Sequence, residues 1–162
     1  MLAILRSTRF KVFGAMGLLF LATAVSADPH TFRSSDPALN QGKKWETTEV
    51  MRQGMANIRQ VMSASQGDIE SEKLSAQDYQ RLAAIVDKNI AEILKNGKLS
   101  KETSKAFHLV VLADLNQSTE QMRTSPKVQT QRVAALGLLQ SLRNYGKYFQ
   151  HPDWRLDEVK SN

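Results

Sequence analysis

Apolar side chains recur every three or four residues in four successive stretches of this chain, and that spacing limits the fold more than any other feature. Each stretch predicts a helix whose apolar face must be buried against other helices. The expected helices cover residues 47–62, 75–96, 100–122 and 125–146. No stretch shows the two-residue alternation of a half-buried strand. We therefore expect an all-α protein, an antiparallel up-down-up-down four-helix bundle.

The first expected helix has a methionine-rich apolar face. Thr47 or Thr48 can cap its start. Its apolar positions are Met51, Met55, Ile58 and Met62. Gly54 lies within this pattern and favours close packing against a neighbouring helix. A polar link is expected at 63–73.

The second helix has the clearest start signal in the sequence. Ser75 is placed as its N-cap and Asp78 as the third helical residue, which together predict a capping box. Asn96-Gly97 predicts a left-handed stop. Only two residues then precede Ser100, the expected cap of the next helix. Such a short link joins antiparallel neighbours.

The third stretch, 100–122, contains the longest apolar run that follows residue 27. His108 falls within or beside its apolar face. Ser125 and Pro126 predict the N-cap and first residue of the last helix. Aromatic residues then gather near the end of the chain and are expected to cover one end of the bundle. They are Tyr145, Tyr148, Phe149 and Trp154.

The N-terminal 27 residues resemble a secretory signal peptide. Basic residues precede an apolar segment, 12–24, which is short for a membrane span, and small residues at 25–27 predict cleavage before Asp28. An uncleaved N-terminal anchor is the alternative. The domain organisation we expect is a cleaved signal peptide (1–27), a flexible arm (28–44), a helical bundle (45–155) and a tail (156–162). The mature protein would be periplasmic and would contain no membrane span.

Cleavage before Asp28 would lower the net charge, which bears on whether the protein binds nucleic acid. Removing 27 of 162 residues leaves 135, and the loss of three basic residues leaves 19 Lys and Arg against 16 Asp and Glu. A net charge of +3 spread over several helices gives no support for nucleic-acid binding. The chain contains no cysteine, which excludes disulfides, cysteine metal ligands and covalent haem attachment.

His108 is the first candidate site residue. A neutral imidazole in an apolar setting can ligate haem or copper, and the thioethers of Met51 or Met55 on a facing helix would complete a site for Cu(I) or haem b. The structural alternative is a packed ring that hydrogen-bonds Ser104, one turn earlier, with the methionines acting as core residues.

The C-terminal aromatic segment holds a second group of candidates. Tyr148, His151 and Trp154 could form a partner-docking patch, and His151 with Asp153 could add metal ligands beside Pro152. An ordinary turn anchored by a buried Trp154 is the alternative. An exposed apolar patch here would favour a chaperone-like protein.

Enzymatic motifs are nearly absent from the sequence. We find no HExxH, GxSxG, P-loop or glycine-rich dinucleotide turn. Ser104 and His108 could pair, but Asp114 lies too far round the helix to act as a third member. The sequence therefore predicts a non-catalytic protein.

Several short motifs resemble those of small exported proteobacterial proteins, and this likeness spans most of the mature chain. The motifs are Trp45 with Gly54-Met55 and Ile58-Arg59, Asn96-Gly97-Lys98-Leu99, Phe107-His108-Leu109-Val110, and Tyr145-Gly146-Lys147-Tyr148-Phe149 followed by His151-Pro152-x-Trp154. The resemblance implies a helical bundle and no particular activity. In that pattern a cysteine often precedes the Lys-Leu pair, whereas this chain has Gly97. Any metal function that used the cysteine would be missing here.

The architecture also resembles the cytochrome c′ and cytochrome b562 bundles. The haem-attachment motif of the first is missing from this chain. In the second, a methionine of helix one and a histidine of the last helix ligate the haem. By that resemblance Met51 or Met55 would take the first role, but His151 lies beyond the last helix and next to Pro152.

These observations predict a soluble periplasmic helical-bundle protein that binds an unidentified protein or small ligand. The rival hypothesis is a copper or haem b protein that uses His108 with a methionine of helix one.

Overall fold

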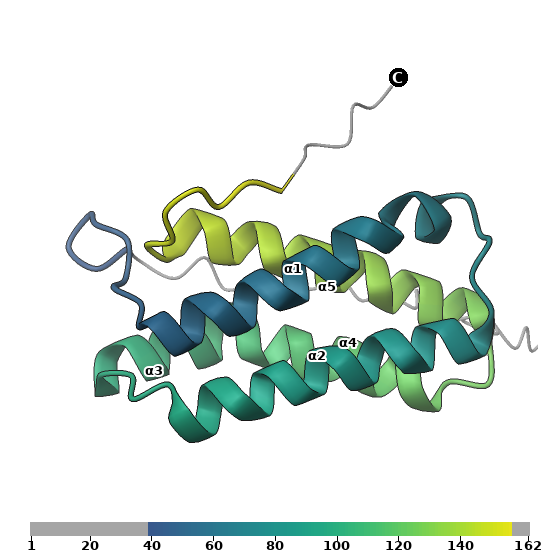
Figure 1. Ribbon diagram of the computed structural model, residues 1–162, viewed down its shortest axis with the longest axis horizontal. Helices are drawn as coiled ribbons and strands as arrows, with labels where there is room; N and C mark the ends of the chain where they lie inside the picture. Colours follow the sequence, from purple (N-terminus) through teal and green to yellow (C-terminus); the bar gives the residue numbers. More distant parts are fainter. Residues whose placement is uncertain (1–38, 157–162) are drawn as a thin grey trace, which may run out of the picture. The chain divides into compact units, whose positions relative to one another are not determined.

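Four long helical stretches account for most of the residues that the computed structural model describes, 39–156 (Figure 1). They are α1 (Glu49–Glu70), α2 (Ala76–Asn96), a continuous stretch formed by α3 (Lys101–Phe107), the π-helical turn η1 (His108–Leu112) and α4 (Ala113–Thr124), and α5 (Val128–Tyr148). Between residues 39 and 156 there is no strand, only two isolated β-bridges. The prediction of an all-α protein is confirmed. The predicted signal peptide, residues 28–38 of the arm and residues 157–162 lie outside the described residues.

Helix α1 is longer than its sequence pattern predicted. Thr48 is its N-cap, as expected, and its hydroxyl accepts a hydrogen bond from the Met51 N–H. The predicted polar link at 63–73 is wrong at its start, because the helix continues to Glu70. Ile69 explains the extension, since it lies seven residues after Met62 and both side chains are fully buried.

The capping box that begins α2 is confirmed. The Ser75 hydroxyl accepts from the Asp78 N–H, and the Asp78 carboxylate accepts from the Ser75 N–H. The end of α2 differs from prediction, because Gly97 is right-handed and Lys98, with φ of 46°, takes the left-handed position. Close approach accounts for the glycine, since a Cβ atom there would lie 2.3 Å from the Ile93 carbonyl oxygen.

The π-helical turn in the third helical stretch was not predicted. It keeps one face of that stretch buried along its length. Thr103 and Met122 are both buried and lie 19 residues apart, which is about 5.3 turns at 3.6 residues per turn. A π-turn accommodates one extra residue, so the remaining 18 make about five whole turns and both side chains reach the core.

Helix α5 begins later than expected. Lys127 occupies the N-cap position and Val128 is the first helical residue, so the prediction that Ser125 caps and Pro126 begins this helix is wrong. The Ser125 hydroxyl instead accepts from the Lys127 N–H in the preceding turn. The helix also continues through Gly146 to Tyr148.

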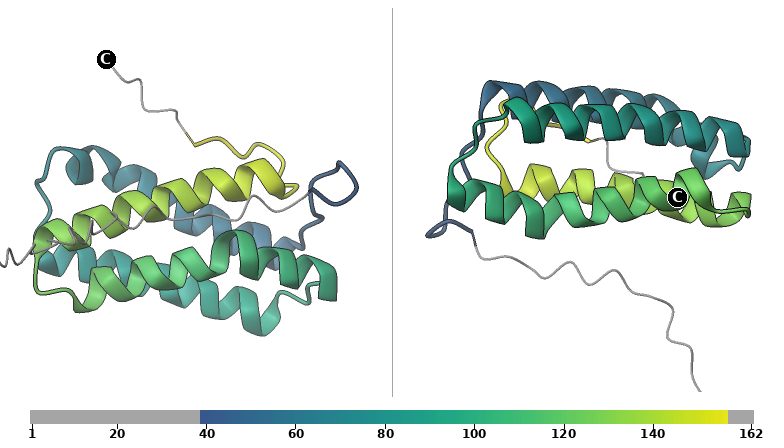
Figure 2. Two further views of the ribbon diagram at one scale, coloured as in Figure 1. Left: turned by 180° about the vertical axis from the view of Figure 1, so that it is seen from behind. Right: turned by 90° about the horizontal axis from the view of Figure 1, so that it is seen from below.

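The helices pack around one apolar core, with α1 and α2 in one layer and α4 and α5 in the other (Figure 2). Helix α4 contacts α2 and α5, and α1 also contacts both. Gly54 allows the close approach expected of it, because a Cβ atom there would lie 2.6 Å from the Ile93 side chain. After α5 the chain turns back, and Trp154 and Leu156 pack against the core. No helix within 39–156 is long and apolar enough to cross a membrane.

Candidate binding site at the α1–α5 junction

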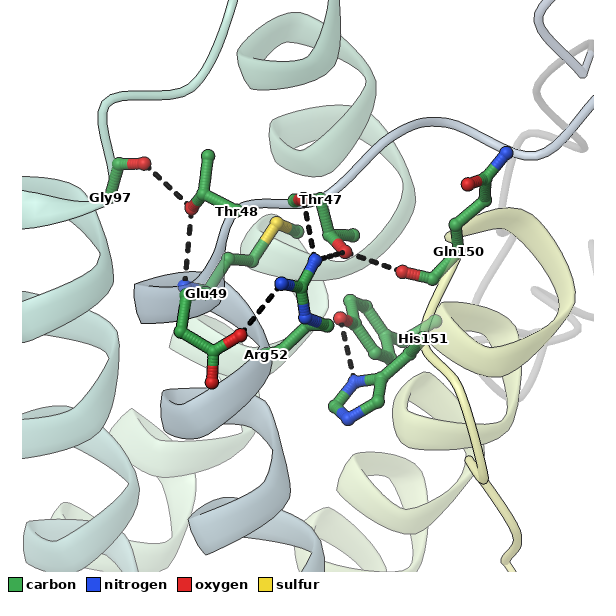
Figure 3. Close-up of polar contacts among 9 residues, drawn as sticks. Thr47, Thr48, Glu49, Arg52, Gly97, Gln150 and His151 are labelled. Carbon is green, nitrogen blue, oxygen red and sulfur yellow. Dashed lines mark hydrogen bonds and ion pairs between the residues drawn. The ribbon is translucent and has the colours of Figure 1, made fainter.

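The segment that precedes α1 and the segment that follows α5 are hydrogen-bonded to each other (Figure 3). The Trp45 N–H donates to the Tyr148 carbonyl and the Gln150 N–H donates to the Trp45 carbonyl, both at 2.8 Å. The Thr47 hydroxyl donates to the Gln150 carbonyl, and Lys44 Nζ donates to the Gly146 carbonyl at 2.6 Å. We call this region the α1–α5 junction. Its backbone is held by contacts that span about a hundred residues of sequence.

Arg52 is fixed within the junction by the first turn of α1. Its guanidinium donates to the Thr47 carbonyl at 2.8 Å and to the Glu49 carboxylate at 2.6 Å. Glu49 is largely exposed, so this ion pair adds little to stability. Its main effect is to orient the guanidinium.

Tyr145 and His151 form the central polar pair of the junction. The Tyr145 hydroxyl lies 3.1 Å from Nδ1 of His151. Burial raises the pKa of the Tyr145 phenol well above its ordinary value, so the hydroxyl stays protonated and donates to Nδ1. A neutral imidazole that accepts at Nδ1 carries its proton on Nε2. The arrangement therefore selects one tautomer of His151.

The surroundings of His151 favour that neutral ring. Partial burial lowers its pKa, and the positive charges of Arg52 and Arg59 lower it further. The Tyr145 and Trp154 rings also contact the imidazole, with centroids at 5.7 and 4.9 Å. At neutral pH His151 is thus a hydrogen-bond donor through Nε2 and carries no charge.

A pocket of about 180 Å³ opens beside this pair. It is lined by Glu49, Arg52, Gln53, Ala56, His151 and Pro152. Imidazole, guanidinium and amide donors thus share one small open space with the Glu49 carboxylate, which pairs with Arg52. This chemistry suits a ligand that accepts hydrogen bonds, such as a carboxylate or a phosphate.

His108 and the methionines of α1 are not brought together. His108 is exposed at the start of η1, whereas Met51 and Met55 are fully buried in the core. The expectation that His108 meets these methionines in the apolar interior is therefore wrong. The π-turn is the reason, because it leaves His108 and Leu109 outside while the next three residues are buried.

Neither the alternative for His108 nor the predicted metal ligands His151 and Asp153 has the required geometry. The His108 backbone N–H donates to the Ser104 carbonyl within the helix, but no hydrogen bond of the His108 ring to Ser104 is found within residues 39–156, so the predicted ring contact is not seen either. In the same part of the chain no three His, Asp or Glu side chains converge on one point. Nδ1 of His151 is occupied by Tyr145, and Asp153 is an exposed turn residue.

The three predicted partner-binding residues do not form an exposed aromatic patch. Tyr148 is buried, and Trp154 is half-buried with the Arg59 guanidinium 5.4 Å from its ring centroid. Only His151 of the three lines the junction pocket. The chaperone-like alternative therefore loses the surface on which it depended.

Sequence reasoning missed Tyr145 and Arg52 as functional partners of His151. Tyr145 lies six residues before His151, and the end of α5 falls between them. The sequence pattern therefore predicts only a packing role for Tyr145. Arg52 belongs to another helix, so its proximity depends on tertiary structure. Comparison with protein-family models, with curated proteins and with solved structures finds no match to this chain.

Proposed function

We propose that this protein is a non-catalytic helical-bundle protein that binds a small anionic ligand in the α1–α5 junction pocket. The observation that carries the proposal is the Tyr145–His151 hydrogen bond, which leaves Nε2–H as the remaining donor of a ring that lines the pocket. The Arg52 guanidinium lines the same pocket and, although paired with the Glu49 carboxylate, has further N–H donors. Carboxylates and phosphates accept hydrogen bonds from both groups.

The bundle is proposed to be antiparallel, with up-down-up-down order. Contacts between helix ends support this arrangement. The Thr48 hydroxyl at the start of α1 donates to the Gly97 carbonyl just after α2, at 2.7 Å. Arg132 near the start of α5 donates to the Ile69 carbonyl near the end of α1, at 2.9 Å. Each contact joins the start of one helix to the end of another.

The site of action is proposed to be the periplasm, after cleavage of residues 1–27. The charge and apolar pattern of that segment supports export. Intact-mass measurement on the protein recovered from a periplasmic fraction tests this directly. A mature chain that begins at Asp28 is expected, and a chain that retains residues 1–27 would contradict the proposal.

Ligand binding is tested by titrating the full mature protein with acetate and with inorganic phosphate while following the histidine ring signals by NMR. The His151 signals are expected to shift and saturate, and the Arg52→Gln variant is expected to lose that response. His108 is an internal control because its ring lies on a different surface of the same molecule. Equal, unsaturating shifts at both rings would contradict a site at the junction.

The copper or haem b alternative has its own test. An absorption spectrum and a metal analysis of protein isolated from its native periplasm would reveal either group. Our proposal expects no Soret band and no stoichiometric copper. A Soret band, or copper that is lost in His108→Ala, would overturn it.

A further inference from the structure

A second surface, distinct from the junction pocket, lies between the last turn of α2 and the α3–η1 segment. It is a groove of about 370 Å³ whose walls include Leu94, Lys101, Lys105, His108, Leu109 and Leu112. We call it the α2–α3 groove. None of these residues lines the junction pocket, so the two surfaces can be tested separately.

Two leucines on opposite walls of the groove are unusually open to solvent. Leu94 on α2 is 55% exposed and Leu109 on η1 is 51% exposed. Leu109 follows the exposed His108 and directly precedes the buried Val110, Val111 and Leu112, so the π-turn leaves it outside the core. Since π-turns are rare and occur frequently at functional sites, this local geometry favours a role for the exposed leucine.

Positive charge borders the same groove. Lys101 and Lys105 lie four residues apart on α3 and both line the groove. Like charges at that spacing oppose helix formation slightly. Neither lysine takes part in any of the ion pairs found between residues 39 and 156. Carboxylates from outside would relieve this repulsion.

We propose that the α2–α3 groove is a docking surface for an acidic amphipathic helix of another protein. Apolar side chains of the partner would pack between Leu94 and Leu109, as in other helix-in-groove complexes. Its flanking carboxylates would pair with Lys101 and Lys105. Charge complementarity of this kind gives specificity and a strong dependence on salt.

The shape of the surface favours a helix over an anionic membrane. The apolar surface is confined to a groove between two helical segments, with basic residues along one of them. Membrane association by charge typically needs a cluster of about 4–8 basic residues on an open face. Binding to anionic vesicles without binding to the peptide would therefore overturn the proposal.

The test uses two synthetic helical peptides with leucine at positions i, i+3, i+4 and i+7, one carrying glutamate at the flanking positions and the other lysine. Fluorescence anisotropy with the full mature protein measures the Kd of each. The glutamate peptide is expected to bind, and the lysine peptide is expected to bind much more weakly. Vesicles of phosphatidylglycerol serve as the membrane probe.

Substitutions in the α2–α3 groove then test whether the peptides bind there. Lys101→Glu with Lys105→Glu should raise the Kd of the glutamate peptide by about tenfold or more and improve binding of the lysine peptide. The matched control is Lys73→Glu, an exposed lysine before the other end of α2. Leu109→Ser should weaken both peptides. Unchanged affinity in the double charge reversal, or equal loss in Lys73→Glu, would overturn the proposal.

Discussion

One imidazole ring connects most of the polar groups at the α1–α5 junction. His151 accepts a hydrogen bond from the Tyr145 phenol, contacts Trp154, and lies near the charges of Arg52 and Arg59. Burial and both arginines oppose a positive charge on the ring. The junction is therefore built around the neutral form of this histidine.

Acid is expected to destabilise the protein through His151. Its pKa in the folded protein lies below the ordinary value of 6.5, so below about pH 6.5 the unfolded chain binds more protons than the folded one. The free energy of unfolding should then fall as the pH drops from 6.5 through the folded pKa. Urea unfolding at a series of pH values measures this, and His151→Gln should show a smaller fall than the wild type.

His108→Gln is the matched control, because it removes an exposed imidazole from η1. It reports how much of any change follows from losing a surface histidine. An identical pH dependence in His151→Gln and in the wild type would show that the junction does not perturb this ring.

A second prediction concerns the contact between Gly146 and Trp154. A Cβ atom at Gly146 would lie 2.3 Å from Cδ1 of the indole, so Gly146→Ala must displace Trp154. Overpacking of this kind typically costs about 1–3 kcal/mol, against a gain of about 1 kcal/mol in helix propensity. We expect a net loss of unfolding free energy of up to about 2 kcal/mol, measured by urea unfolding with tryptophan fluorescence.

The same substitution should have the opposite sign when Trp154 is removed. In a Trp154→Ala background, Gly146→Ala is expected to stabilise the protein by about 1 kcal/mol through helix propensity alone. A destabilising effect of similar size in both backgrounds would mean that the indole is not the group in contact with Gly146.

At the scale of the elements, local signals predicted helix starts better than helix lengths. The Ser75 capping box and the Thr48 and Ser100 caps depend on neighbouring residues only, and all three are present. The last turns of α1 were missed because the polar residues after Met62 face solvent, and only Ile69 carries the apolar pattern forward. The start of α5 was misplaced because Ser125 caps a turn before the helix.

The π-turn could not be predicted from the sequence for a different reason. Residues 106–112 are nearly all apolar, so their spacing does not distinguish a π-turn from a wide α-helical face. Burial of Val110, Val111 and Leu112 in succession depends on the helices that surround them. The position of His108 depends on that turn, and the predicted site around it failed for this reason.

Deleting Leu109 tests the π-turn. If η1 accommodates one extra residue, its removal should leave a regular helix, with α3 and α4 still presenting their buried faces to the core. We expect the free energy of unfolding to change by no more than about 1 kcal/mol in urea unfolding, far less than a register shift costs.

Deletion of Gln117, an exposed residue of the regular helix α4, is the control. It rotates every following residue of that helix by about 100° and should unfold or severely destabilise the protein. Comparable damage from the two deletions would mean that η1 holds no extra residue.

At the scale of the whole described structure, contacts that are distant in sequence join its first and last segments. The Trp45–Phe149 bridge and the Thr47–Gln150 hydrogen bond involve the two residues directly before His151, which lines the junction pocket. Arg132 and Glu72 form an ion pair that joins α5 to the link after α1. The junction pocket therefore depends on these long-range contacts, although its residues come mainly from two short segments.

An engineered disulfide can measure how firmly these segments are joined, because the natural chain has no cysteine. Once oxidised, Thr47→Cys with Gln150→Cys should raise the free energy of unfolding by about 2–4 kcal/mol over the reduced form, since the bond closes a loop of roughly a hundred residues. The control pair, Thr47→Cys with Lys127→Cys, joins the starts of α1 and α5, which the proposed antiparallel order places at opposite ends. It should form no crosslink within one molecule. Efficient crosslinking of the control pair would refute that order.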